Sequence, residues 1–519
     1  MLCAVTKLSK TKLGIKTAFS VVLIALIQGG LSFYRISVVL GTYGDEINGV
    51  VQVALQISAY LVLMQGGMSA AYQYKMYAPF ANKEYNKVSA LFAGLQRSML
   101  KLSGKMILIA LIIIPGYSAL LINQGVGYWD TVLILLAIGI RITAPYFFTL
   151  PERVLIDIKE KKYIVILIEG TKDILTLATE ILLILFTKLP LPIILCVGFV
   201  YLGIAKLIYL RLVRHYYGKS FSLKSLPEYA SSKMTKAVYA HQAASIATGN
   251  TDNVVLSLLS GLRNVTIYSA FAGLIAYPHV VISRMIEGMR ASLALRITRD
   301  DKGSYPAFKE MLAFSFFCVC VIVPVFLRLA NPFVSLWIGQ QYNIPWLPII
   351  LFSLILADRL IMPVIYAARD AKGLYEQSKK FTIAQAIVNV VLSVALVIPF
   401  GINGVLIGTI AALYFILQPF NFRLVYSTVF GRKLTIYYEL AVVALICAAS
   451  FFVCGFAIKG IVGENAWLVL AVKAAVCTAI ATGISSVVLW SSNRGFRMFV
   501  KRFFIRRHAL PDIGDSSEE

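Results

Sequence analysis

The chain has 519 residues, of which 59% are hydrophobic and 14% are charged, and its mean hydropathy is +0.79. Soluble domains are about 45–50% apolar and about 25% charged, so this composition excludes an ordinary soluble protein. The formal net charge is +24. In a soluble protein this excess would indicate nucleic-acid binding. Here the basic residues lie between long apolar runs, where they act as topology signals and contact anionic lipids.

Apolar runs long enough to cross a bilayer recur along the whole chain. A transmembrane helix needs about 20 mostly apolar residues. In chain order we expect helices at 15–40, 47–74, 104–123, 130–150, 163–187, 189–210, 237–260, 265–294, 308–330, 345–368, 380–400, 403–425, 436–457 and 466–490. The predicted fold class is therefore an all-α membrane protein with about 14 transmembrane helices.

The distribution of basic residues tests this map independently. Lys and Arg gather in every second connection, namely at the N-terminus and within 75–105, 153–162, 211–236, 296–309, 369–380, 423–433 and 494–507. The alternate connections carry almost none. By the positive-inside rule, this pattern predicts an even number of spans in the cell membrane, with both termini in the cytoplasm. The longest connection, 211–236, is too short for a sizeable soluble domain.

A weak internal symmetry guides the predicted domain organisation. Gly41 and Gly261 are expected to end the first and seventh helices, which lie six spans apart. This spacing is compatible with two pseudo-symmetric six-helix bundles followed by a helix pair. We place an N-terminal bundle, a second bundle, transmembrane helices 13–14 and a cytoplasmic tail at 1–225, 226–430, 431–492 and 493–519.

Arginines inside the predicted spans are the first candidate functional residues. A charge at the bilayer centre costs about 2.5–3.5 kcal/mol on insertion scales, so such residues are usually paired or functional. Arg35 and Arg141 have no acidic neighbour at helical spacing, whereas Arg284 has Glu287. Arg290 is near a helix end and can also reach the membrane surface. Because guanidinium groups bind phosphates bidentately, we predict all four arginines as substrate diphosphate-binding residues.

A second group of interior charges is predicted to serve ion coupling or gating. Asp252 is isolated and can titrate or bind a cation. Glu287 lies three residues from both Arg284 and Arg290, so it can also bridge them structurally. Asp358 and Arg359 are adjacent and point about 100° apart on a helix, which makes them poor mutual partners.

Other features of the spans have structural explanations as well as functional ones. Glu169, Lys172 and Asp173 are spaced so that they can neutralise one another on their own helix. Prolines inside the spans suit helices that bend during transport, but they are also common in transmembrane helices generally. These interior prolines are Pro145, Pro278, Pro324 and Pro363.

Motifs for ATP hydrolysis, metal binding and catalysis are missing. The Gly218-Lys219-Ser220 tripeptide lacks the earlier glycine of a phosphate-binding loop, since Val213 stands there. The four histidines show no metal-ligand spacing, and no large loop carries catalytic carboxylates. We therefore expect no enzymatic activity and no cofactor, which leaves a transporter, a channel or a membrane scaffold.

Several short motifs follow one another in a defined order along the chain. The first are Tyr34-Arg-Ile-Ser-Val-Val-Leu-Gly41, the run 49–63, Gly67-Met-Ser-Ala-Ala71 and Tyr77-Ala-Pro-Phe-Ala81. Later ones are Thr251-Asp-Asn-Val-Val-Leu-Ser257, Ile267-Tyr268, Ala291-Ser-Leu293, Trp337-Ile-Gly339, Asn389 with Ser393, and Phe400-Gly-Ile-Asn-Gly-Val-Leu-Ile-Gly-Thr409. In their order and spacing these motifs resemble the Wzx-like polysaccharide flippases of the multidrug/oligosaccharidyl-lipid/polysaccharide exporter (MOP) superfamily. The sequence departs from the family's pattern after Leu293, where Ala294-Leu-Arg296 follows.

This resemblance implies a MATE-like, V-shaped transporter of two bundles around a central cavity. It implies a polyprenyl-diphosphate-linked oligosaccharide as cargo, moved from the inner to the outer leaflet by alternating access for capsule or exopolysaccharide synthesis. It further implies coupling to a proton or sodium gradient. A polysaccharide polymerase and a chain-length regulator are the protein partners it suggests, alongside membrane lipids and with no nucleic acid.

Three alternatives stay open at this stage. A peptidoglycan-precursor lipid flippase would bind a similar diphosphate. A cation-coupled multidrug exporter of the same superfamily would have an acidic and aromatic site, whereas the interior charge here is mainly basic. A membrane scaffold of a polysaccharide assembly complex would tolerate substitution of the interior arginines.

Overall fold

The computed structural model describes residues 2–63, 68–159, 161–218, 225–229, 251–299 and 303–502, and within these ranges it is all-helical. The chain divides into two compact units. Unit 1 comprises residues 1–269 and 393–405, and unit 2 comprises 270–392 and 406–519. The boundaries predicted from the sequence at 225/226 and 430/431 remain predictions.

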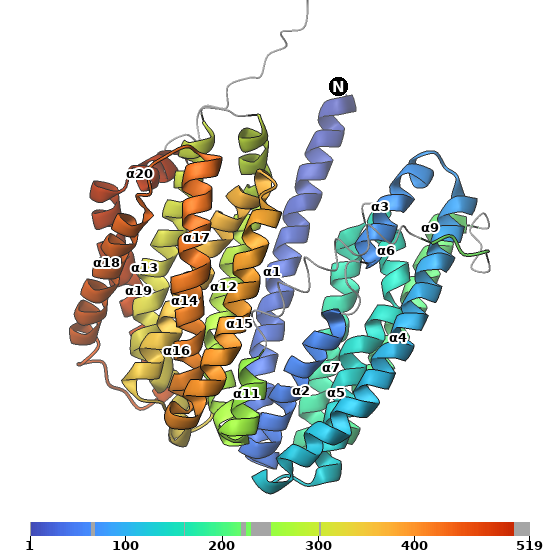
Figure 1. Cartoon of the computed structure of the whole chain (residues 1–519), viewed down its shortest axis with the longest axis horizontal. Coiled ribbons are helices and arrows are strands. Elements are labelled where there is room, and N and C mark those ends of the chain that lie inside the picture. Colours follow the sequence, from blue (N-terminus) through green and yellow to red (C-terminus); the bar gives the residue numbers. More distant parts are fainter. Residues whose placement is uncertain are drawn as a thin grey trace, which may run out of the picture. The chain divides into compact units, whose positions relative to one another are not determined.

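Unit 1 is built from long helices and shorter connecting ones (Figure 1). They are α1 Leu2–Tyr43, α2 Asp45–Leu63, α3 Met68–Ala81, α4 Tyr85–Leu121, α5 Tyr128–Phe148, α6 Leu150–Ile158, α7 Lys162–Phe186, α8 Leu191–Leu195, α9 Val197–Tyr217, α11 Asp252–Leu259 and the first residues of α12 Leu262–Thr298. Within it, α1 packs on α7, α2 on α5, and α9 on both α5 and α7.

Unit 2 is arranged around α13. Its helices are the remainder of α12, α13 Ser304–Trp337, α14 Trp346–Ala371, most of α15 Tyr375–Phe400, most of α16 Ile402–Ala412, α17 Gln418–Arg423, α18 Ile436–Ala457, α19 Ala466–Ser492 and α20 Arg494–Val500. Short π-helical turns at Leu413–Leu417 and Leu424–Val429 flank α17. Helix α13 contacts α14, α18, α19 and α20.

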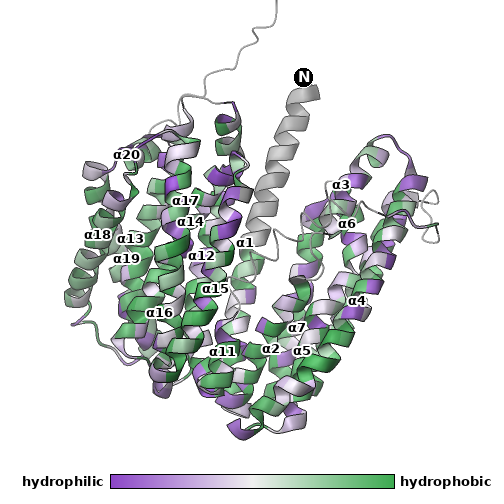
Figure 2. Ribbon diagram, viewed as in Figure 1, coloured by the Kyte–Doolittle hydropathy of each residue, from purple (hydrophilic) through white to green (hydrophobic). Residues whose placement is uncertain are grey.

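Eleven of the described helices are long and apolar enough to cross a membrane. Figure 2 shows apolar residues along their lengths. On α4 the side chains of Leu108, Leu111 and Ile112 are 61%, 59% and 69% exposed, which suits contact with lipid rather than water. The all-α membrane fold is thereby confirmed.

Three of the predicted spans fall outside these eleven for different reasons. The fifth predicted span corresponds to α7, which is excluded because it carries four charged residues between 169 and 180. Most of the seventh predicted span, 237–260, lies outside the described residues, and so do residues 64–67 of the second. The described part of the second span belongs to two helices, α2 and α3.

Several helices extend well beyond the spans predicted from hydropathy. Helix α1 begins at Leu2 rather than residue 15, and α4 begins at Tyr85 rather than residue 104. Hydropathy marks only the apolar part of a helix, and the helical hydrogen bonds continue into the polar residues beyond it. Gly41 lies inside α1, and the left-handed glycine that separates α1 from α2 is Gly44, at φ +88°. Gly261, at φ +100°, separates α11 from α12 as predicted.

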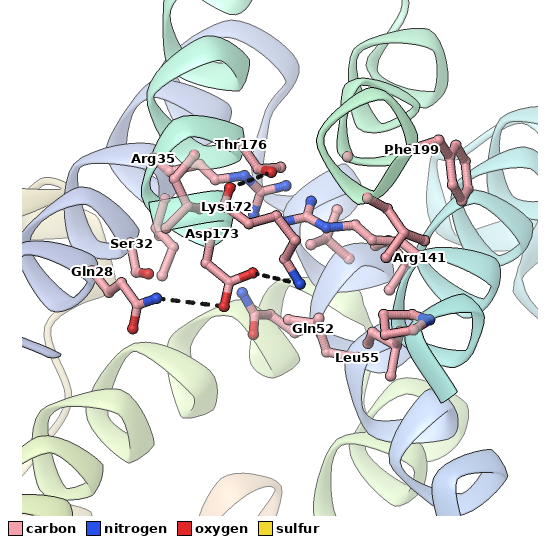
Figure 3. A pocket seen from close by; sticks show the side chains of 18 residues that line it. Gln28, Ser32, Arg35, Gln52, Leu55, Arg141, Lys172, Asp173, Thr176 and Phe199 are labelled. Carbon is pink, nitrogen blue, oxygen red and sulfur yellow. Dashed lines mark hydrogen bonds and ion pairs between the residues drawn. The ribbon is translucent and has the colours of Figure 1, made fainter. Parts of the chain in front are cut away.

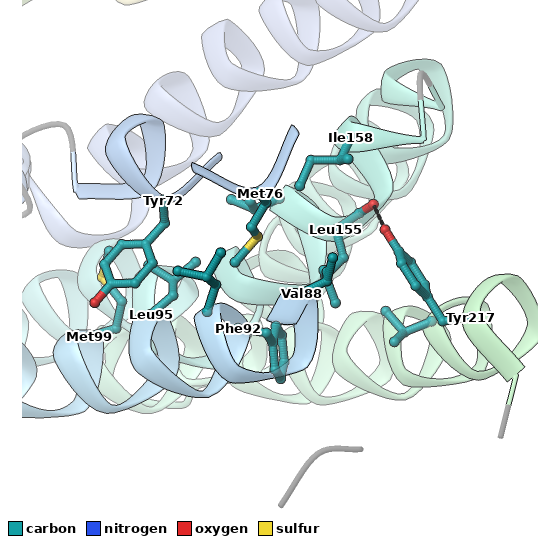
Figure 4. Packing of buried hydrophobic residues seen from close by; sticks show 12 residues of the cluster. Tyr72, Met76, Val88, Phe92, Leu95, Met99, Leu155, Ile158 and Tyr217 are labelled. Atoms are coloured by element: carbon teal, nitrogen blue, oxygen red, sulfur yellow. Dashed lines mark hydrogen bonds between the residues drawn. The ribbon is translucent and has the colours of Figure 1, made fainter. Parts of the chain in front are cut away.

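A compact apolar core stabilises one end of unit 1. It joins α3, α4, α6 and α9 and includes Met76, Phe92 and Leu155, all of them fully buried (Figure 4). The Tyr217 hydroxyl donates a hydrogen bond of 2.7 Å to the Leu155 carbonyl, which satisfies its polar group inside this core. Of the helices in this core, α9 also contributes residues to the candidate site.

Candidate functional site

A cavity of about 500 Å³ lies inside unit 1, among α1, α2, α5, α7 and α9. Its polar wall is formed by Gln28, Ser32, Arg35, Gln52, Arg141, Lys172, Asp173 and Thr176 (Figure 3). Apolar residues such as Leu55 and Phe199 complete the lining. A cavity of this size within membrane helices can hold a polar group of a small-molecule or lipid ligand.

Two of the predicted arginines meet in this cavity through a shared carboxylate. Glu180 on α7 is completely buried, and its Oε2 accepts a hydrogen bond of 2.6 Å from Arg35 Nε. Its Oε1 accepts a hydrogen bond from Arg141 Nη1. The two arginines are thus brought together, but each already has an acidic partner from another helix, which spacing along their own helices did not indicate.

The contact with Glu180 occupies only part of each guanidinium. Each group has five N–H donors in a planar fork. The recorded hydrogen bonds use Nε of Arg35 and Nη1 of Arg141, so the other nitrogens remain able to donate. The two side chains are 11% and 26% exposed, which keeps them accessible from the cavity. The arrangement can therefore bind an additional anion while Glu180 holds the arginines in place.

A second layer of charges lies along α7, at the spacing that the sequence predicted for local pairing. Lys172 Nζ is 2.7 Å from Glu169 Oε2 and 3.2 Å from Asp173 Oδ1. Arg153 from α6 also contacts Glu169, at 2.7 Å. Gln28 from α1 donates to Asp173 at 3.4 Å, as Figure 3 shows. The local pairing is confirmed, and it extends to neighbouring helices.

Charge balance at the cavity is close to neutral with a small basic excess. The cavity wall carries Arg35, Arg141 and Lys172 against two carboxylates from α7, which are Asp173 on the wall and the buried Glu180. Buried ions are tolerable only when they are paired and hydrogen-bonded. The network meets that requirement and leaves one net positive charge for a ligand.

Close helix packing positions this network. Helix α7 approaches α1 at Gly170, where an added Cβ would lie 2.6 Å from Ile24 Cγ2. Gly198 on α9 faces the aliphatic part of Arg141, where an added Cβ would lie 3.4 Å from its Cδ. The absence of side chains at these two glycines lets α7 and α9 lie near the arginines.

The remaining predicted diphosphate ligands lie on the part of α12 that belongs to unit 2. Arg284 Nη1 is 3.4 Å from Glu287 Oε2, and both side chains are largely exposed. Arg290 Nη2 instead pairs with Asp370 on α14 at 2.5 Å. Glu287 thus pairs with one of its two arginine neighbours, and Arg290 has a partner on another helix. The predicted role of these residues in substrate binding remains a prediction.

The candidate coupling residues are divided between the two units. Asp252 begins α11 in unit 1, is buried, and accepts a hydrogen bond from the Tyr268 hydroxyl. Asp358 on α14 is buried in unit 2 and accepts a hydrogen bond from Gln418. For the neighbouring Arg359 guanidinium, no ion pair is recorded among the described residues. Asp358 and Arg359 do not pair with each other, as their spacing indicated.

Glu180 is the site residue that the sequence-based candidates missed. It follows Asp173 by seven residues, so it lies on the same helix face as Asp173 and Thr176. That periodicity was the available signal. Among the described residues, no cluster of His, Cys, Asp and Glu could hold a metal ion.

The fold can be compared with solved structures. A lipid II flippase, MurJ, in an inward closed conformation superposes with a TM-score of 0.68 and 13% identity over 91% of this chain and 99% of that one. An inward-facing multidrug resistance MATE family transporter of the MOP superfamily gives a TM-score of 0.60 and 13% identity, covering 77% and 98%. The MATE multidrug transporter DinF-BH gives a TM-score of 0.51 and 14% identity, covering 80% and 97%.

Comparisons of sequence give no corresponding match. No family model matches the chain, and no curated protein matches it. At such low identities the structural likeness concerns the fold. The chain therefore has the fold shared by the MurJ flippase and the MATE transporters.

Proposed function

We propose that this protein is a flippase that moves polyprenyl-diphosphate-linked oligosaccharides from the inner to the outer leaflet for surface polysaccharide synthesis. Transport would proceed by alternating access and would be driven by a proton or sodium gradient. The observation that carries the proposal is the cavity of unit 1, where Arg35 and Arg141 share the buried Glu180 and Lys172 lies on the same wall. This group offers guanidinium donors and a net positive charge within membrane-spanning helices.

The chemistry of the cavity favours a diphosphate over a cationic drug. Arg is suited to bidentate phosphate binding, and its charge cannot be removed by burial. An organic cation would need an acidic wall, but every carboxylate recorded at this cavity is paired with a basic side chain. The polar wall also carries Gln28, Ser32 and Gln52, whose side chains can hydrogen-bond the first sugar.

A second candidate is a flippase for a peptidoglycan precursor. The observation that favours it is the fold similarity to the structure described as a lipid II flippase, with a TM-score of 0.68. Both candidates move a lipid diphosphate, so the arginine chemistry supports them equally. The sequence motifs that resemble the Wzx-like group favour an oligosaccharide cargo.

Transport by the purified protein in vesicles would test the proposal. Vesicles would carry a fluorescent polyprenyl-diphosphate oligosaccharide, lipid II with the same label, or a fluorescent organic cation. We expect faster translocation of the oligosaccharide lipid than in protein-free vesicles. Faster movement of lipid II alone would establish the second candidate, and movement of the cation alone would refute both flippase assignments.

Variants of the cavity identify the residues responsible. Arg35→Ala and Arg141→Ala should abolish translocation, because each removes a guanidinium group that can bind phosphate bidentately. Arg35→Lys should restore little, since a lysine keeps the charge but not the bidentate geometry. Arg211→Ala, at an exposed arginine of α9 in the same unit, is the matched control for loss of one positive charge. Equal loss of transport in the control would show that the assay reports charge or insertion rather than the site.

A further inference from the structure

A second polar cavity, of about 540 Å³, lies at one end of unit 2. It is formed by the start of α13, the start of α18 with the preceding segment, and α20 with the end of α19. We call it the α13–α20 pocket, and its polar and aromatic lining includes Tyr305, Lys309, Arg432, Tyr438, Glu439 and Arg494. Four of them, Tyr305, Lys309, Arg432 and Arg494, come from three of the segments whose basic charge predicts a cytoplasmic location.

Helix α20 is held against α13 by a glycine and by aromatic contacts. An added Cβ at Gly495 would collide with the Lys309 carbonyl oxygen, so only glycine allows this approach. Phe496 stacks on Phe317 with ring centroids 5.5 Å apart, and the Asn493 side chain accepts a hydrogen bond of 3.1 Å from the Phe496 amide. The close packing of α20 on α13 therefore fixes this wall of the pocket.

The carboxylates of the surrounding segments already have basic partners. The segments 304–310, 432–439 and 492–502 contain two acidic residues, Glu310 and Glu439. Glu439 pairs with Lys309, and Glu310 is 3.1 Å from Arg502 Nη1. No acidic side chain is recorded as a partner of Arg432 or Arg494 in the described part of the chain, so two guanidinium groups at the pocket lack a counter-ion.

The environment of these two arginines is that of a membrane interface. The pocket lies where three apolar helices end, since α13, α18 and α19 are all long and apolar enough to span a bilayer. Tyr438 is 70% exposed beside the pocket, and aromatic residues with a polar tip are typical of the headgroup level. The Arg432 guanidinium lies 5.4 Å from the centre of the Tyr305 ring, and this cation–π contact orients the guanidinium.

We propose that the α13–α20 pocket binds the phosphodiester headgroup of an anionic phospholipid of the bilayer, with Arg432 and Arg494 as the phosphate ligands. Basic pockets between transmembrane helices on the cytoplasmic side bind such headgroups. The acyl chains would lie along the apolar surfaces of α13 and α18. This site is separate from the cavity of unit 1 and does not depend on the proposed cargo.

Binding of short-chain lipids to the purified full-length protein would test this inference. Fluorescently labelled dioctanoyl phosphatidylglycerol would be titrated in detergent and followed by fluorescence anisotropy, with dioctanoyl phosphatidylcholine and inorganic phosphate as competitors. Unlabelled phosphatidylglycerol should displace the probe, while phosphatidylcholine and phosphate should compete at least about tenfold more weakly. Displacement by phosphate as effective as by the lipid would assign a free-anion site and overturn the lipid proposal. Equal competition by phosphatidylcholine would overturn the preference for an anionic headgroup.

Variants locate the binding in the pocket. A charge-assisted hydrogen bond contributes about 1.5–3 kcal/mol, so Arg432→Ala with Arg494→Ala should weaken the lipid at least about tenfold. Both side chains belong to exposed residues, so folding should be retained. Arg423→Ala, at another exposed arginine of unit 2, is the matched control. Gly495→Ala should also weaken binding without removing charge, because it displaces α20 from α13. Unchanged affinity in the double arginine variant would refute the assignment.

Discussion

Substitution of Glu180 by Gln provides the sharpest test of the cavity in unit 1. Glu180 Oε2 and Oε1 accept hydrogen bonds from Arg35 and Arg141, and the Glu180 side chain has no solvent exposure. The Gln variant keeps the shape but leaves two neighbouring guanidinium groups without their counter-ion. Removing one partner of a buried ion pair costs about 3–5 kcal/mol. We expect a loss at the lower end of this range, because Arg141 is 26% exposed and gains some solvation.

The order of stabilities is as informative as the size of the loss. Arg35→Gln or Arg141→Gln alone leaves Glu180 with one arginine, so each should destabilise less than Glu180→Gln. Combining Glu180→Gln with Arg35→Gln should recover part of the loss, since only one cation then remains. The free energy of unfolding would be followed by SDS titration of the purified protein. A Glu180→Gln protein as stable as the wild type would refute the counter-ion role.

A ligand can separate a structural role from a substrate role. Pyrophosphate should stabilise Glu180→Gln more than the wild type, because it can replace the missing negative charge. Stabilisation follows RT ln(1 + [L]/Kd), which is about 2.7 kcal/mol at a ligand concentration 100 times Kd. Sodium chloride at matched ionic strength serves as the control. Equal effects of pyrophosphate and chloride would contradict specific binding of a diphosphate.

Three further predictions concern other residues. Arg284→Ala should abolish surface polysaccharide. Insertion should be unchanged, because the exposed pair of Arg284 with Glu287 contributes only about 0.2–1 kcal/mol to stability. Normal polymer export by the double variant Arg35→Ala, Arg284→Ala would refute diphosphate binding by these arginines. Asp252→Asn should alter the pH dependence of transport, and Tyr268→Phe, which removes the hydroxyl that donates to Asp252, is the partner variant. Transport rates of Asp252→Asn that are unchanged at every pH would exclude Asp252 as a coupling residue. Gly170→Ala should destabilise unit 1 by about 1–3 kcal/mol through contact with Ile24, and Ile24→Ala should relieve the loss in unfolding experiments.

The membrane fold was predictable because hydropathy and charge report directly on the environment of each segment. The predicted span 436–457 coincides with α18, and 466–490 lies within α19. The helical extensions at Leu2 and Tyr85 were not predictable from hydropathy, since a helix outside the bilayer needs no apolar run. The charged helix α7 was predicted at 163–187 as one of the apolar runs of spanning length.

The partners of the interior charges were only partly predictable. Contacts at helical spacing, such as Lys172 with Glu169 and Arg284 with Glu287, follow from the sequence. The contacts of Arg35 and Arg141 with Glu180 span 145 and 39 residues of sequence. One sequence does not indicate which helices are neighbours, so it showed only that these two arginines have no acidic neighbour on their own helices.

The shared carboxylate bears on how a flippase with this cavity would work. Two buried arginines without a counter-ion would cost free energy before any ligand binds. They would then bind a diphosphate too tightly to release it. With Glu180 in contact with both, an arriving diphosphate competes with an existing charge, and its net gain in free energy is smaller. A transporter must bind its cargo strongly enough to select it and weakly enough to release it. Under the proposed function, Glu180 sets that balance, so Glu180→Gln should raise diphosphate affinity while slowing translocation.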